Sequence, residues 1–113
     1  MTLYIDNKKH EVEVLKTYYI KDDSLCIILL EENKRFASLT INLSVRIMSN
    51  NVAFVNVKEC PWAEKFIEEN ELGKKVGTAL EDNDCKYPLY EFYVEKIKSA
   101  ERKLWEEKYH AWL

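Results

Sequence analysis

The chain has 113 residues, of which 47% are hydrophobic and 33% are charged. This length suits a single domain over residues 1–113, and the composition excludes an intrinsically disordered chain. No apolar run approaches the ~20 residues of a membrane-spanning helix, and no secretion signal opens the sequence, so we expect a cytoplasmic protein. The net charge of −3 argues against nonspecific binding to DNA or RNA, which depends on Lys and Arg side chains.

The first half of the chain has the pattern of an antiparallel β-meander. A turn-like Asp6-Asn7-Lys8 separates its first two apolar segments and predicts a β-hairpin. Residues 25–30 are apolar on both faces, which predicts a strand at the centre of a sheet. Polar turns separate all the strand candidates, which are residues 3–5, 10–20, 25–30, 36–43 and 52–57.

The pattern changes to a helical period after Val57. Pro61 suits the first position of a helix, and apolar residues then recur at intervals of three and four up to Ile67. A short amphipathic helix is therefore predicted, with its end at residues 70–73. Residues 73–84 contain both glycines and an acidic run. This composition predicts a surface loop.

The last third predicts one more strand and a second helix. Residues 87–93 have strand character, and Pro88 would limit that strand to a sheet edge because proline has no N–H to donate. From Val94 onward, apolar residues recur at helical spacing to the end of the chain. The whole pattern predicts an α+β fold, in which an antiparallel β-meander of about five to six strands is packed by a short helix and a C-terminal helix.

Few residues offer catalytic or metal-binding chemistry. His10 and His110 lie where a solvated histidine is the ordinary finding, and three cysteines are an odd count that favours reduced thiols. No CxxC or HxxxH pair and no glycine-rich phosphate loop is present. We therefore expect no enzyme, no metal and no cofactor. A thiol- or metal-dependent enzyme remains an alternative, and it would require Cys60 or Cys85 to be reactive at neutral pH.

Negative charge is concentrated in the middle of the chain, where residues 58–84 hold eight acidic and four basic side chains. One interpretation is a solvated helix face and loop. The other is a protein interaction surface, because exposed aromatic residues beside carboxylates are typical of such surfaces and select a basic partner. The candidate partner-binding residues are Glu64, Glu68, Glu69, Glu71, Glu81, Asp82, Asp84, Tyr90, Trp105 and Trp112.

Three segments also carry a family resemblance. They are residues 36–43 (FASLTINL), 60–67 (CPWAEKFI) and 87–92 (YPLYEF). In this order they resemble an uncharacterised family of small bacterial proteins that are commonly encoded on phages, plasmids and conjugative elements. The resemblance spans roughly residues 3–95, and the segment from Lys96 onward is expected to be particular to this chain. That family has no assigned catalytic residues that could be transferred.

The resemblance implies a context rather than a chemistry. Small, acidic, non-enzymatic proteins of mobile elements often block a host defence component, as anti-CRISPR proteins do. The leading hypothesis is therefore an inhibitor that occludes a basic partner surface, such as that of a CRISPR effector nuclease, by steric and electrostatic means. The alternative is an accessory or regulatory interaction module of the element, and a homo-oligomer is open under either hypothesis.

Overall fold

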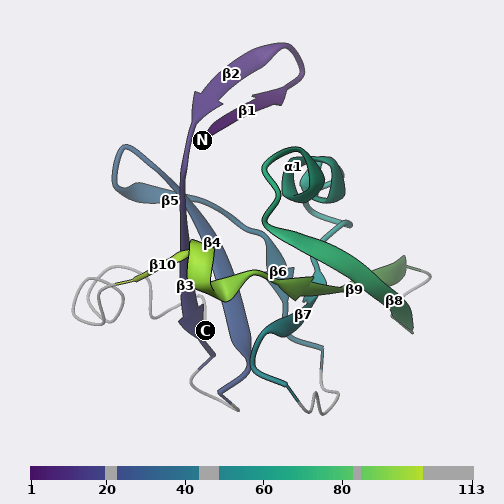
Figure 1. Cartoon of the computed structure of the whole chain (residues 1–113). Helices are drawn as coiled ribbons and strands as arrows, with labels where there is room; N and C mark the ends of the chain where they lie inside the picture. The colour runs from purple at the N-terminus through teal and green to yellow at the C-terminus, as the bar shows by residue number, and fades with distance from the viewer. Residues whose placement is uncertain (20–22, 44–48, 83–84, 101–113) are drawn as a thin grey trace.

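The computed structural model describes residues 1–19, 23–43, 49–82 and 85–100, with the backbone alone at residues 78–82. Within these residues, ten strands form three sheets, and the helices are α1 (Ala63–Glu69) and a short 3-10 helix, η1 (Val94–Lys96) (Figure 1). Neither described helix has the length and apolar character needed to cross a membrane.

The strands divide into a hairpin, called sheet A, and two four-stranded sheets, called B and C. Sheet A pairs β1 (Thr2–Ile5) with β2 (Lys8–Glu11). Sheet B has the order β10 (Lys98–Ser99), β3 (Glu13–Tyr18), β4 (Leu25–Glu31) and β5 (Lys34–Ser38). Sheet C has the order β6 (Thr40–Ile41), β7 (Val52–Val55), β9 (Cys85–Phe92) and β8 (Gly73–Asp82).

Two-residue turns close the β1–β2 and β4–β5 hairpins. Asp6 and Asn7 have φ of 50° and 66°, and Glu32 and Asn33 have φ of 52° and 63°. Consecutive positive φ values define the type I′ turn, whose twist matches that of the flanking strands. The hairpin predicted at the start of the chain is confirmed, although it ends at Glu11 and a separate strand, β3, follows.

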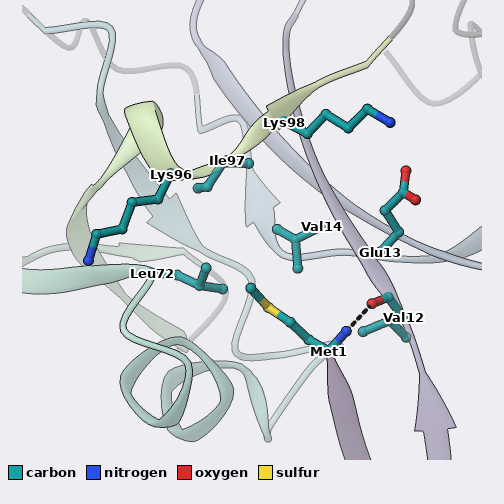
Figure 2. Close-up of a pocket in the computed structure, with 8 residues that line it drawn as sticks. All are labelled: Met1, Val12, Glu13, Val14, Leu72, Lys96, Ile97 and Lys98. Carbon is teal, nitrogen blue, oxygen red and sulfur yellow. Dashed lines mark hydrogen bonds between the residues drawn. The ribbon is translucent and has the colours of Figure 1, made fainter.

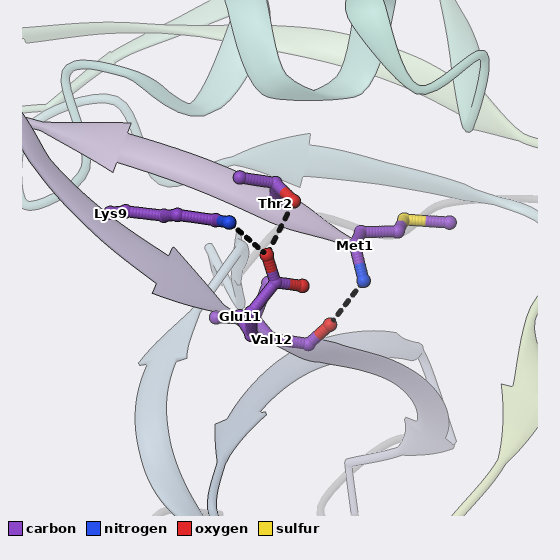
Figure 3. A network of polar contacts seen from close by, with 5 residues as sticks. All are labelled: Met1, Thr2, Lys9, Glu11 and Val12. Atoms are coloured by element: carbon purple, nitrogen blue, oxygen red, sulfur yellow. Dashed lines mark hydrogen bonds and ion pairs between the residues drawn. The ribbon is translucent and has the colours of Figure 1, made fainter.

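Polar contacts hold the β1–β2 hairpin closed (Figure 3). The Thr2 hydroxyl donates to Glu11 Oε1 at 2.6 Å, and Lys9 Nζ lies 3.6 Å from the same oxygen. The hydrogen bond from Thr2, with help from Lys9, lowers the pKa of Glu11. The Met1 amino group donates to the Val12 carbonyl at 2.8 Å, which joins the start of β1 to the residue that follows β2.

Sheets B and C meet at Leu39 and Thr40. Leu39 N donates to Ile27 O at 2.9 Å, and Ile27 N donates to Thr40 Oγ1 at 3.1 Å. The Leu39 carbonyl accepts from Asn56 N at 2.9 Å. The predicted strand over residues 36–43 is therefore divided at this point, so that its first part belongs to sheet B and its second part to sheet C.

The main core lies between β4, α1 and β9. One face of β4, the inner face of α1 and the start of the β7–β9 pairing contribute side chains that are at most 3% exposed. The other face of β4 packs Cys26, Ile28 and Leu30 against Leu15 and Tyr19. β4 is buried on both faces and lies between β3 and β5, which confirms the central strand that its apolar run predicted.

The predicted α+β fold is wrong: the described chain is mostly β, with α1 as its one α-helix. The predicted C-terminal helix is wrong for its first residues, because η1 and β10 lie there instead. β10 pairs in parallel with β3, and Ala100 N donates to Lys16 O at 2.9 Å. Main-chain pairing and burial of Ile97, which is 5% exposed, outweigh the helical spacing here. Residues 101–113 lie outside the described residues.

The predicted loop over residues 73–84 is also wrong, because residues 73–82 form β8. β8 pairs with β9 from Gly73, opposite Phe92, to Asp82, opposite Cys85. The register shifts between Lys75 and Gly77 and again between Thr78 and Leu80. These bulges let a glycine-containing, polar segment follow β9 despite lacking the alternation of a regular strand.

The expectation that Pro88 restricts its strand to an edge is wrong as well, since β9 lies between β7 and β8. The pairing of β7 with β9 covers Glu91, Tyr90 and Leu89 and stops before Pro88. On its other side, Pro88 lies opposite Thr78, next to a register shift. Proline is tolerated because it comes where one neighbouring ladder has ended and the other is irregular.

Candidate functional site

A tyrosine from β9 and two carboxylates from α1 form the best-defined polar cluster. Glu64 and Glu68 are four residues apart and therefore share one face of the helix. The Tyr90 ring is buried, and its hydroxyl lies 2.9 Å from Glu64 Oε1 and 3.4 Å from Glu68 Oε1. Since the hydroxyl has one proton, it donates mainly to Glu64. Burial and the two carboxylates raise the pKa of Tyr90, which keeps the donor protonated.

Lysines neutralise part of the acidic segment. Lys75 Nζ lies 3.7 Å from Glu64 Oε1, and Lys65 Nζ lies 3.7 Å from Glu69 Oε1. In contrast, Glu68 and Glu71 are exposed and form no ion pair with any lysine or arginine that the structure describes. The surface on and next to α1 is thus of mixed charge, and on it Glu68 and Glu71 are available to a partner.

These two glutamates border a shallow hollow of about 470 Å³ between α1, the start of β8 and η1. Lys74, which also lines it, lies 3.7 Å from Glu91 Oε1, and the Lys96 ammonium lies 5.1 Å from the centre of the Tyr93 ring. We call this surface the α1–η1 face, and its lining residues are Glu68, Glu71, Gly73, Lys74, Lys75, Tyr93 and Lys96.

A second hollow, of about 320 Å³, lies on the other side of Lys96 (Figure 2). Figure 2 shows the side chains of Met1, Val14, Leu72 and Ile97 around it. Charged side chains stand at its margin, from Glu13, Lys96 and Lys98. Because it has an apolar floor, this hollow interrupts the charged surface next to the α1–η1 face.

The structure brings together some of the predicted partner-binding residues and separates others. Glu64, Glu68 and Tyr90 form one cluster, and Glu71 borders the adjacent hollow. Glu69 does not line that hollow and pairs with Lys65 instead. Glu81 and Asp82 belong to the far end of β8. Asp84, Trp105 and Trp112 lie outside the described residues.

Sequence reasoning missed the three lysines of the α1–η1 face. Lys74 and Lys75 are two of the four basic residues within residues 58–84, so their charge was a usable signal. Lys96 carried no such signal, because η1 comes to this face through the pairing of β9 with β8 and the hydrogen bond from Tyr93 N to the Leu72 carbonyl. Nothing in the sequence showed that the Tyr90 hydroxyl meets α1, since 26 residues separate Tyr90 from Glu64.

His10 is not the solvated residue that its position by a turn suggested. Its Nδ1 lies 2.8 Å from Glu31 Oε2, and its ring centre lies 4.7 Å from that of Phe36. The ring contacts continue through Trp62 to Phe66 at 6.2 Å each. His10 thereby joins sheet A to sheet B and to the start of α1, which is a structural role.

The three cysteines are free. Cys26 and Cys60 are buried, and burial raises the pKa of each thiol to about 11, with the Glu59 carboxylate adding to the effect at Cys60. Such thiols hold little of the nucleophilic thiolate at neutral pH. Cys85 is partly exposed. The described residues contain no group of three or more His, Cys, Asp or Glu side chains placed to hold a metal ion.

A family model described as a domain of unknown function, DUF4313, matches residues 12–112. The chain belongs to DUF4313. No curated protein and no solved structure gave a match. The uncharacterised family expected from the sequence is thus supported, but its limits differ from the expected span of roughly 3–95. The DUF4313 match leaves out the β1–β2 hairpin and includes the C-terminal segment that we expected to be particular to this chain. The α1–η1 face lies wholly inside it.

Proposed function

We propose that this DUF4313 protein is a non-enzymatic binding protein that acts in the cytoplasm and covers a basic surface of a partner protein through its α1–η1 face. The observation that carries the proposal is the pair of exposed carboxylates, Glu68 and Glu71, at the border of the hollow. Glu68 is fixed relative to the core by Phe66 and Ile67 of α1, and Glu71 by its neighbour Leu72, since these three side chains are at most 2% exposed. Charges held on a rigid backbone bind a partner with little loss of entropy.

The charges of this face favour a local anchor over broad imitation of DNA. Lys74 and Lys75 are already paired with Glu91 and Glu64, so the carboxylates that remain for a partner are few. Complementary charges of this kind select the partner and speed its association more than they add affinity. Shape complementarity over the hollow would supply much of the remaining free energy of binding.

The partner that we propose is a nuclease of a host defence system, such as a CRISPR effector, and the origin that we propose for the gene is a mobile element. The resemblance of the three sequence segments to mobile-element proteins supports both proposals. Nucleases of this class hold nucleic acid in Lys/Arg-rich channels, where carboxylates compete for the same cations. An accessory module that pairs through β8 is the second candidate, and the position of β8 at the end of sheet C favours it.

The test is affinity capture with the tagged protein from a lysate of a host with active defence systems. The captured proteins are washed at rising salt concentration and identified by mass spectrometry. We expect a basic nuclease that is released by moderate salt and inhibited by the purified protein. Glu68→Lys with Glu71→Lys should abolish capture and inhibition. Glu69→Lys with Glu95→Lys is the matched control, because both residues are exposed and neither lines the hollow.

Equal inhibition by the double variant and the wild type would remove the α1–η1 face from the mechanism. Capture of the protein itself, or of element-encoded proteins alone, would favour the accessory module. The circular dichroism spectrum of each variant should match that of the wild type. A loss of binding can then be assigned to the changed charges and not to unfolding.

A further inference from the structure

The strand β8 is a long strand at the end of a sheet. It has ten residues, and within the part of the chain that the structure describes it pairs with β9 alone. Figure 1 shows the β8–β9 pair running outward to the margin of the molecule. The outer edge of such a strand presents main-chain N–H and C=O groups to which another extended strand can pair.

The charges of β8 are arranged with opposite signs at its two ends. Lys74 and Lys75 lie near its start, with side chains 61% and 49% exposed, and Val76 beside them is 48% exposed. Glu81 and Asp82 occupy its last two positions. The ion pairs that Lys74 and Lys75 make within the chain are 3.7 Å long and exposed, so both lysines can change partners at little cost.

We propose that two copies of this chain pair antiparallel through β8. With the twofold axis at Thr78, Lys74 of one copy lies opposite Asp82 of the other, and Lys75 lies opposite Glu81. The twofold axis repeats each of these pairings, so every lysine position of β8 lies opposite an acidic position and two sheets C join into one continuous sheet.

The same charges disfavour other pairings of β8. A parallel in-register pairing would place lysine against lysine and carboxylate against carboxylate, which is destabilising. The lysines at the edge of β8 disfavour pairing with any strand that places no acidic residue opposite them. The dimer is closed because each copy uses the one edge of β8, so the interaction does not continue into a filament. This inference does not depend on the proposed function of the α1–η1 face.

The test is sedimentation velocity of the full chain from micromolar to near-millimolar concentration. We expect a concentration-dependent dimer in the wild type. Lys74→Glu with Lys75→Glu should weaken dimerisation by about tenfold or more, because like charges then oppose each other. Glu81→Lys with Asp82→Lys should have the same effect. An equimolar mixture of the two double variants should form a heterodimer, since opposite charges face each other again.

The heterodimer separates loss of pairing from loss of fold, because misfolded chains would not associate on mixing. Lys65→Glu with Lys96→Glu is a control that changes the net charge equally away from β8, and it should dimerise as the wild type does. Hydrogen exchange should slow at residues 74–82 as the concentration rises. A monomeric wild type over the whole range, unchanged dimerisation of both charge variants, or no association on mixing would each overturn the inference.

Discussion

Gly73 and Gly77 lie in the same strand but have different surroundings. A Cβ atom at Gly73 would lie 2.5 Å from the Glu91 carbonyl oxygen, whereas a Cβ atom at Gly77 would meet nothing within 4 Å. Contacts of 2.5 Å do not occur for real Cβ atoms, so alanine at Gly73 would force β8 away from β9. Gly73 is therefore required for the close approach of the two strands.

We predict that Gly73→Ala lowers the free energy of unfolding by about 1–3 kcal/mol through overpacking. Gly77→Ala is the matched control and should be neutral or stabilising by about 0.5 kcal/mol, since it restricts the unfolded chain without a clash. Urea denaturation of the two variants measures the difference. Equal effects of the two substitutions would show that β8 and β9 are not held at this distance.

Tyr90 illustrates how much of the candidate site could be predicted from the sequence. Glu64 and Glu68 are four residues apart, so the predicted helix already placed them on one face. The Tyr90 hydroxyl and the Lys75 ammonium come to this face from β9 and β8. The positions of these two groups depend on how sheet C packs against α1. No local sequence pattern predicts that packing.

At the scale of single elements, the type I′ turns are only partly matched by their residues. Asn33 tolerates a positive φ well, but Glu32 at φ 52° is a residue type that rarely adopts it. Left-handed backbone costs an ordinary L-residue roughly 1–2 kcal/mol. The β4–β5 turn therefore keeps its shape because the flanking strands impose it.

We predict that Glu32→Asn with Asn33→Gly stabilises the protein by about 0.5–1 kcal/mol, because Asn-Gly is the preferred pair for this turn. Thermal denaturation measures the gain. Glu95→Asn serves as the control, because Glu95 is exposed and is not among the described residues with positive φ. A loss of stability in the turn variant would mean that the side chains of Glu32 and Asn33 contribute more than the left-handed backbone costs.

The elements that the sequence predicted correctly are those with local signals. The β1–β2 hairpin follows from its turn residues, and α1 follows from its helical spacing after Pro61. The elements predicted wrongly, β8 and residues 94–100, take their structure from β9 and β3. The partner strand of β8 follows it closely in the chain, whereas the partner strand of residues 98–99 is distant in sequence. In both cases the hydrogen bonds to the partner strand outweigh the local preference.

At the scale of the whole molecule, the core contains several acidic groups that are protonated in the folded state. Burial raises the pKa of Cys26 and of Cys60 to about 11, and it also raises the pKa of Tyr19. In the unfolded chain a thiol ionises from about pH 8.5 upward. The folded state therefore binds more protons than the unfolded state above that pH, and stability must fall as the pH rises.

We predict that the free energy of unfolding is independent of these thiols below about pH 8 and falls by up to about 1.4 kcal/mol per pH unit for each thiol between about pH 9 and 11. Urea midpoints measured from neutral pH to about pH 10 test this. Cys26→Ala with Cys60→Ala should lower stability at neutral pH but flatten the decline above about pH 9. An equally steep decline in that variant would assign the effect to other groups.

The pairing of β10 with β3 has a consequence for synthesis on the ribosome. β3 takes its second neighbour from residues 98 and 99, and the Lys16 side chain reaches back to the Val94 carbonyl. Nascent chains are synthesised at roughly 5–20 residues per second. For several seconds, therefore, one edge of β3 is unpaired and the core lacks Ile97. Stalling or early release of the ribosome before residue 97 would leave this edge available to other nascent chains. For this fold, accurate completion of translation is part of what protects it from aggregation.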